Sequence, residues 1–154
     1  MKTNVTYLET KYHINQKKAK VHCLLEFGID LTKIPGIEHL LVMPRFIKYI
    51  EDLTNKYTGV AAFIRIPKGS DVGIVVFKTD GLACCSKKDK FDVALGKKIA
   101  STRAQKKSFL IARDFYDTIL NIIDTDYYVK IENMYLNCIK TFDKCSNHEK
   151  DLVK

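Results

Sequence analysis

Polar and apolar residues alternate near the start of the chain, in the manner of half-buried β-strands. Residues 5–14 place Val, Thr, Tyr and Ile among polar residues, and residues 19–27 repeat this pattern before Gly28. The polar residues 15–18 between the two runs are typical of a turn. The pattern predicts an antiparallel hairpin within residues 1–33.

Helical spacing replaces this alternation after Pro44, a residue that fits the first turn of a helix. Apolar residues then recur at helical intervals, so we predict a helix over about 44–57 that stops near Gly59.

Three short apolar runs come next, at residues 60–66, 73–78 and 82–86. Their lengths and their β-branched residues predict strands. Asp80 and Gly81 lie between the last two runs, and this dipeptide is a strong signal for a two-residue hairpin turn. We therefore expect three antiparallel strands in this part of the chain.

Helical spacing returns in the second half of the chain. Apolar and small residues recur at helical intervals from Ala100 to Ile122, and Asp89 or Asp92 is suited to cap the helix that they form. The pattern predicts one long helix, or two helices broken near residues 107–108.

A last helix is predicted over about 127–144, and the residues from 146 onward are expected to fray. Its apolar stripe consists of Tyr128, Ile131, Tyr135, Cys138 and Phe142. This stripe packs either into the core of the chain or against a second copy, which would give a homodimer through the C-terminal helix.

These elements predict an α+β fold: an antiparallel sheet with the element order ββ-α-βββ-α-α, and helices packed on one face. The length fits a single domain over residues 1–154. Its expected parts are an N-terminal hairpin (1–33), an α-βββ-α core (44–122) and a C-terminal helix with a frayed end (124–154).

The composition supports a folded chain. Apolar residues make up 46% of it, which is enough for a hydrophobic core. No apolar run has the length of a membrane span, and the first residues lack the apolar segment of a secretory signal. We therefore expect a cytoplasmic protein with no membrane partner.

Charge is distributed unevenly along the chain, whose net charge is +8. Residues 86–113 carry 9 basic and 2 acidic groups, whereas residues 114–154 carry 5 basic and 8 acidic groups. The basic segment predicts an anionic partner, and the alternative is a solvated lysine-rich face. The residues expected to bind are Lys87, Lys88, Lys90, Lys97, Lys98, Arg103, Lys106, Lys107, Arg113 and, from a strand–turn corner, Arg65.

The sequence contains no nucleophile motif, no phosphate-binding loop and no zinc-protease motif. Asp89 and Asp92 fit helix caps better than paired catalytic carboxylates, and His13 and His22 fit a cross-strand pair better than a site. We predict a protein that is not an enzyme and has no catalytic residues, no metal and no cofactor.

The cysteines and tyrosines each leave two interpretations open. The cysteines, Cys23, Cys84, Cys85, Cys138 and Cys145, lack the spacing of zinc ligands or of a disulfide framework. We expect buried, reduced thiols, with a metal or redox role as the alternative. Tyr116, Tyr127 and Tyr128 follow the basic helix, where they either pack in the core or stack on a base.

One stretch of the sequence, about residues 72–104, has a distinctive pattern. It runs G-I-V-V-F-K-T-D-G over residues 73–81, then Cys84, then Asp89, Phe91, Asp92, Gly96, Ala100, Arg103 and Ala104. This pattern resembles a group of small, mostly uncharacterised phage and prophage proteins. Members of that group often have Arg directly after the glycine, whereas this chain has Lys97, which weakens any bidentate anion contact from that position.

The resemblance implies a phage or mobile-element protein that acts against a bacterial defence system. Its partner would be a host defence protein, as for anti-CRISPR proteins, or the nucleic acid of that protein. The alternative is a sponge for a cyclic nucleotide signal, similar to the Thoeris anti-defence sponges.

A further interpretation comes from the element order. The predicted order over residues 44–122 is similar to that of the double-stranded-RNA-binding domain, whose second helix begins with a lysine-rich segment. Residues 96–100, Gly-Lys-Lys-Ile-Ala, look similar to that segment. Direct binding of double-stranded RNA or DNA in phage replication or regulation is therefore a second hypothesis.

Overall fold

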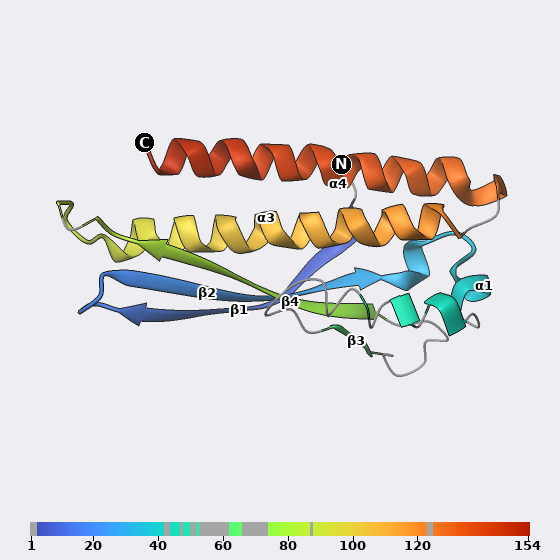
Figure 1. Ribbon diagram of the computed structural model, residues 1–154, viewed down its shortest axis with the longest axis horizontal. Helices are drawn as coiled ribbons and strands as arrows, with labels where there is room; N and C mark the ends of the chain where they lie inside the picture. Colours follow the sequence, from blue (N-terminus) through green and yellow to red (C-terminus); the bar gives the residue numbers. More distant parts are fainter. Residues whose placement is uncertain are drawn as a thin grey trace.

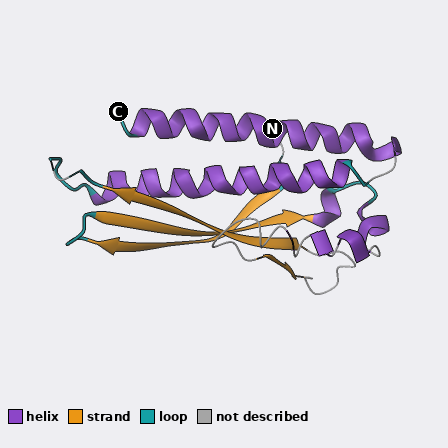
Figure 2. Cartoon of the chain, in the orientation of Figure 1, coloured by secondary structure: helices purple, strands orange, loops and turns teal. Residues whose placement is uncertain are grey.

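The computed structural model arranges the chain as a twisted antiparallel sheet with two long helices stacked on one side of it (Figure 1). Figure 2 shows the same arrangement by secondary structure, with the remaining residues in grey. The structure describes residues 3–41, 44–46, 48–49, 52, 62–65, 74–86, 88–122 and 125–154.

Strands β1 (Val5–Asn15) and β2 (Lys20–Asp30) form the hairpin that the alternation predicts, and both are slightly longer than expected. The turn between them is closed by the side chain of Asn15, which accepts a hydrogen bond of 3.0 Å from the backbone N–H of Lys18. Such side-chain bonds to the backbone are the reason that asparagine is favoured in turns.

Strand β4 (Ile74–Cys84) contradicts the predicted turn at Asp80 and Gly81, because it runs through both residues without a break. It pairs along its whole length with β2. The reason is the contact with the helix above: a methyl group on Gly81 would overlap the backbone carbonyl of Ala100 and lie 2.7 Å from the backbone nitrogen of Ala104. The glycine serves a close approach of strand and helix, as glycines inside strands often do.

The observed sheet therefore has the strand order β1-β2-β4-β3, where β3 (Ala62–Arg65) pairs with the first residues of β4. The α+β class and the antiparallel sheet are confirmed. The predicted order ββ-α-βββ-α-α is wrong, since one long strand replaces the last two strands. The topological likeness to the double-stranded-RNA-binding domain is lost with it.

Short helical segments connect β2 to β3. They are η1 (Leu31–Lys33), α1 (Ile37–Leu41) and the helical residues 44–46, 48, 49 and 52. The last group agrees with the helix predicted over 44–57 as far as the structure describes it. The rest of that helix lies outside the described residues, as do positions 60–61, 66 and 73 of the predicted strands.

Helix α3 (Val93–Leu120) is continuous, so the prediction of one long helix is confirmed rather than the broken alternative. It begins where the sequence predicts a cap, because the side chain of Asp92 accepts a hydrogen bond from the backbone N–H of Leu95. Its buried side includes Ala100 and Ala104, whose small side chains let the helix lie close to the sheet.

Helix α4 (Thr125–Leu152) packs along α3, so the two helices form successive layers above the sheet (Figure 1). Ile131 and Cys138, from the predicted apolar stripe, are completely buried within the chain. The helix is longer than the predicted 127–144, because it continues to Leu152. Glu149 holds this last part by ion pairs with α3.

The core is unevenly thick along the molecule. Around the stacked rings of Phe27 and Phe77, 5.3 Å apart, it contains large side chains from the sheet and from both long helices. Burying each such ring contributes about 2–3 kcal/mol. Near the hairpin turn the core narrows to small side chains such as Cys23, Ala83 and Ala104. The sheet and α3 therefore lie closest at the end that carries the turn and the start of α3.

Candidate functional site

The predicted basic segment divides into two parts in the structure. The second part consists of Arg103, Lys106, Lys107 and Arg113. Nε of Arg103 lies 2.9 Å from Oε1 of Glu149, and Nζ of Lys106 lies 3.2 Å from Oε2 of the same carboxylate. Nη2 of Arg113 lies 3.0 Å from the carboxylate of Asp114. Three of these cations are therefore already in ion pairs with acidic residues of the chain.

Glu149 is half-buried between the two long helices. Burial by itself would raise the pKa of its carboxyl group. The hydrogen bonds and charges of Arg103 and Lys106 outweigh that effect, so the pKa lies below its usual value. Glu149 is thus a charged clamp between α3 and the end of α4.

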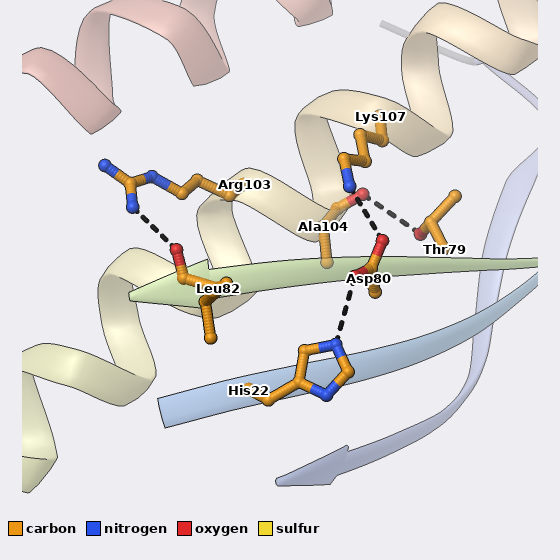
Figure 3. Close-up of polar contacts among 7 residues, drawn as sticks. All are labelled: His22, Thr79, Asp80, Leu82, Arg103, Ala104 and Lys107. Atoms are coloured by element: carbon orange, nitrogen blue, oxygen red, sulfur yellow. Dashed lines mark hydrogen bonds and ion pairs between the residues drawn. The ribbon is translucent and has the colours of Figure 1, made fainter. Parts of the chain in front are cut away.

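The same face of α3 is fastened to the backbone of β4, as Figure 3 shows. Nη1 of Arg103 donates a hydrogen bond of 2.6 Å to the carbonyl oxygen of Leu82. In the other direction, the hydroxyl of the buried Thr79 donates to the carbonyl oxygen of Ala104 at 3.1 Å. Arg103 therefore has a structural role on both sides.

Asp80 occupies the centre of the third contact (Figure 3). Its Oδ1 lies 2.7 Å from Nζ of Lys107, and its Oδ2 lies 3.0 Å from Nε2 of His22. The hydrogen bond from Lys107 lowers the pKa of Asp80 most; burial opposes this shift, and the hydrogen bond from His22 adds to it. His22 also lies opposite His13 in the hairpin, as expected for a cross-strand pair.

The first part of the basic segment has a different environment. Lys88 and Lys90 precede α3, and Lys97 and Lys98 lie in its first turns. The hairpin turn brings further lysines beside them, because the backbone N–H of Cys85 donates a bond of 2.9 Å to the carbonyl of Ala19. We call the resulting group the basic end; it consists of Lys17, Lys18, Lys20, Lys88, Lys90, Lys97 and Lys98. It forms the end of the molecule where the C-terminus lies (Figure 1).

The basic end presents its charge to solvent. All its lysines are exposed except Lys97, which is half-buried. None of them forms an ion pair with an acidic residue that the structure describes. The start of a 28-residue helix adds the positive end of its dipole at the same place. The described part of the basic end thus has seven lysines against the two carboxylates of Asp89 and Asp92.

Two predicted residues cannot be assigned to the basic end. Lys87 lies outside the described residues. Arg65 belongs to β3, which pairs with Ile74 at the start of β4, whereas the basic end adjoins Cys84 at its other end. A strand of this length separates the two ends by roughly 30 Å.

One of the three predicted tyrosines has a described side chain, and it packs in the core. Tyr116 is buried, and its hydroxyl donates to the carbonyl oxygen of Thr3 at 3.1 Å. The side chains of Tyr127 and Tyr128 are not among those described. Two tyrosines that the sequence does not single out, Tyr7 and Tyr12 of β1, have 40% and 37% of their surface exposed.

Sequence reasoning also missed the lysines of the hairpin turn. Lys17 and Lys18 are visible as a charged pair in the sequence. Only the sheet register, in which Lys20 lies opposite Cys84, shows that they adjoin the start of α3. The polar residues of the turn could have suggested that these lysines are exposed, but no local sequence pattern indicates that they adjoin the start of α3.

The hollows of the described surface differ in their chemistry. One, of about 320 Å³, lies beside the start of α3, and its lining includes thiols, carboxylates and a lysine: Cys84, Cys85, Asp89, Asp92 and Lys90. A second, of about 370 Å³, is lined by Phe142 and by three cations that are already in ion pairs: Arg103 and Lys106 with Glu149, and Lys107 with Asp80. Another, of about 570 Å³, lies on the outer face of the sheet. Its polar lining is Asn15, Asp80, His13, His22, Lys18 and Lys20, so the described lining holds no hydroxyl or thiol nucleophile.

Metal and thiol chemistry receive no support within the described residues. No group of three or more His, Cys, Asp or Glu side chains there could hold a metal ion. Cys23 and Cys138 are buried thiols, Cys85 and Cys145 are half-buried, and Cys84 is exposed. The expectation of buried thiols therefore holds for two cysteines.

No protein-family model, curated protein or solved structure matches the chain. None of the helices in the described ranges combines the length and apolar character that a membrane span requires. The basic end is therefore the feature on which a function must be argued.

Proposed function

We propose that this protein is a non-catalytic binding protein whose basic end binds the phosphate backbone of a nucleic acid. The observation that carries the proposal is the gathering of lysines from the hairpin turn, the loop before α3 and the first turns of α3. Unlike Arg103 and Lys106, these lysines have no described acidic partner. Their charge is therefore available to an anion.

The chemistry of the basic end favours backbone contacts over base recognition. Its cations are all lysines, which act as point charges towards phosphate. Base-specific contacts in nucleic-acid grooves rely most often on arginine, whose fork binds two acceptors at once. The described arginines Arg103 and Arg113 are held by Glu149 and Asp114. We therefore expect binding with little sequence preference.

The test is a fluorescence-anisotropy titration of a labelled mixed-sequence oligonucleotide at several salt concentrations. The variant carries Lys88→Glu, Lys90→Glu and Lys98→Glu, all at exposed positions. We expect at least about a 10-fold loss of affinity, and a salt dependence whose slope falls by about 1 for each phosphate contact removed.

A matched control changes the net charge equally at the opposite end of the molecule. It carries Lys33→Glu, Lys48→Glu and Lys130→Glu, which are exposed as well. This control should bind nearly as the native protein does. Equal losses in both variants, or no binding by the native protein at about 50 mM salt, would overturn the proposal.

Antagonism of a bacterial defence system is our proposal for the biological role of this binding. It rests on the likeness of residues 72–104 to phage proteins, and the basic end supplies a surface for the nucleic acid of a defence complex. A sponge for a cyclic nucleotide is less favoured, because the hollow with an aromatic wall, beside Phe142, has its cations in ion pairs with Glu149 and Asp80. Co-purification of one defence protein at near-stoichiometric amount with the tagged protein would support the proposed role.

A further inference from the structure

Strand β1 carries a row of large side chains that the long helices leave open. Tyr12 lies opposite Cys23, so both side chains stand on the face of the sheet that α3 covers. Helix α3 packs mainly on β4 and β2, and β1 lies on the far side of β2 (Figure 1). Tyr7, Tyr12 and Ile14 therefore remain 40%, 37% and 42% exposed. We call these three residues the β1 ledge.

The two tyrosines of the ledge are held differently. The ring of Tyr7 meets Phe109 edge-on at 6.5 Å, and burial raises the pKa of its hydroxyl to about 12. Tyr12 instead has Nζ of Lys97 over its ring, 5.3 Å from the ring centre. Tyr7 is thus braced against α3, whereas Tyr12 adjoins a cation of the basic end.

An exposed aromatic ring beside phosphate-binding lysines is the combination with which proteins bind single-stranded nucleic acid. The ring stacks on a base, and the cations follow the backbone. In a duplex the base faces are covered by their neighbours and only the base edges are open in the grooves. A flat ring such as that of Tyr12 can therefore stack only on an unpaired base.

We propose that the nucleic acid bound by the basic end is single-stranded, with one base stacked on Tyr12 in place of the Lys97 ammonium, which moves from the ring to the adjoining phosphate. This inference rests on the proposed function and narrows it to a substrate class. The all-lysine charge and the stacking contact together predict binding that depends on bases but tolerates any sequence.

A second copy of the chain is the competing occupant of the ledge. The outer edge of β1 is not paired with any described strand, and an open edge can pair with another edge. The register of β1 shifts between Tyr7 and Glu9, which is the kind of bulge that discourages such pairing. Single-stranded nucleic acid is therefore the better-supported occupant.

The test compares oligothymidine of about 15 nucleotides with an abasic deoxyribose-phosphate chain of the same length and charge. The native protein should bind the oligothymidine about 5- to 100-fold more tightly, as expected for one stacked base. Tyr12→Ala should lose that difference. Tyr12→Phe, which keeps the ring, and Ile14→Ala, which trims the same ledge, should each bind within about 2-fold of the native protein.

The outcomes separate this inference from the proposed function. Equal binding of oligothymidine, abasic chain and duplex, with reversal of Lys88, Lys90 and Lys98 still harmful, would refute stacking and leave phosphate binding intact. Binding of none of the three ligands would refute both. A dimer in light scattering that Tyr12→Ala dissociates and that oligothymidine does not would assign the ledge to a second copy. The abasic comparison needs no variant, so it stands even if Tyr12→Ala fails to fold.

Discussion

Gly81 shows how a single missing side chain determines the contact between the sheet and α3. Its Cα lies against the backbone of the helix at Ala100 and Ala104, and no other residue type fits there without moving that backbone. Gly28 is a useful comparison, because a methyl group there would meet the side chain of Ile74 rather than a main chain. Side chains can change rotamer, whereas a helix must shift as a unit.

We predict that Gly81→Ala destabilises the protein by about 3 kcal/mol, at the upper end of overpacking effects. Gly28→Ala should cost clearly less, since Ile74 can adjust. The measurement is urea unfolding followed by circular dichroism. An equal loss of stability in the two variants would show that α3 moves as easily as a side chain, and would contradict the close approach of α3 to Gly81.

The charge of Asp80 stabilises the fold, and this stabilisation depends on pH. Lys107 first, and His22 after it, hold the pKa of Asp80 below its usual value. A folded-state pKa below that of the unfolded chain stabilises the fold at pH values above the unfolded pKa. This stabilisation is lost as the pH falls through the folded pKa.

Asp80→Asn should therefore lower the free energy of unfolding at pH 7 by at most about 1 kcal/mol, because the pair is partly exposed. The difference from the native protein should shrink as the pH falls below about 4. Urea unfolding of both proteins over this pH range measures it. A difference that stays constant down to the acid limit would mean that the Asp80 charge does not contribute.

At the scale of elements, the end of α4 depends on one carboxylate. Glu149 reaches Arg103 and Lys106 on α3, whereas the neighbouring acid Asp151 pairs with Lys154 in its own last turn. The first contact joins two helices and the second stays local. Only the first can hold the helix end against its neighbour.

Glu149→Gln should cost about 1–2 kcal/mol, since it leaves two cations with a neutral partner. It should also increase amide hydrogen exchange over residues 146–152. The matched variant Asp151→Asn should leave that exchange almost unchanged. Equal exchange in the native protein and Glu149→Gln would show that apolar contacts alone hold the end of α4.

At the scale of the whole molecule, the exposure of each cysteine depends on how the helices and the sheet pack together. Cys138 of α4 belongs to the hydrophobic core and is completely buried, and burial raises the pKa of its thiol to about 12. Cys23 is buried under α3, and its thiol pKa is raised by burial and by the charge of Asp80. Cys84 is exposed at the end of β4.

In the native protein a thiol reagent should therefore modify Cys84 first and leave Cys23 and Cys138 unmodified until the chain unfolds, because the thiolate is the reactive form. Mass spectrometry of peptides after short labelling, with and without denaturant, measures the order. Modification of Cys138 at the rate of Cys84 would mean that α4 separates from α3 without global unfolding.

Local patterns in the sequence determined the elements of this protein. Alternation predicted the hairpin, helical spacing predicted α3 as far as Ile122, and Asp92 marked where α3 begins. Each of these signals lies within a few residues of the feature it reports, because side-chain periodicity, turns and helix caps involve near neighbours in the chain. The net positive charge of the middle segment was readable in the same way.

The tertiary structure decided the rest. Asp80 and Gly81 continue a strand instead of turning, because α3 requires a position without a side chain at Gly81. Arg103 became a structural residue only when Glu149, distant in sequence, was folded against it. The lysines of the hairpin turn joined those of α3 only through the register of β2 on β4. In each case the deciding contact joins residues far apart in the chain, and no local periodicity encodes which distant groups will meet.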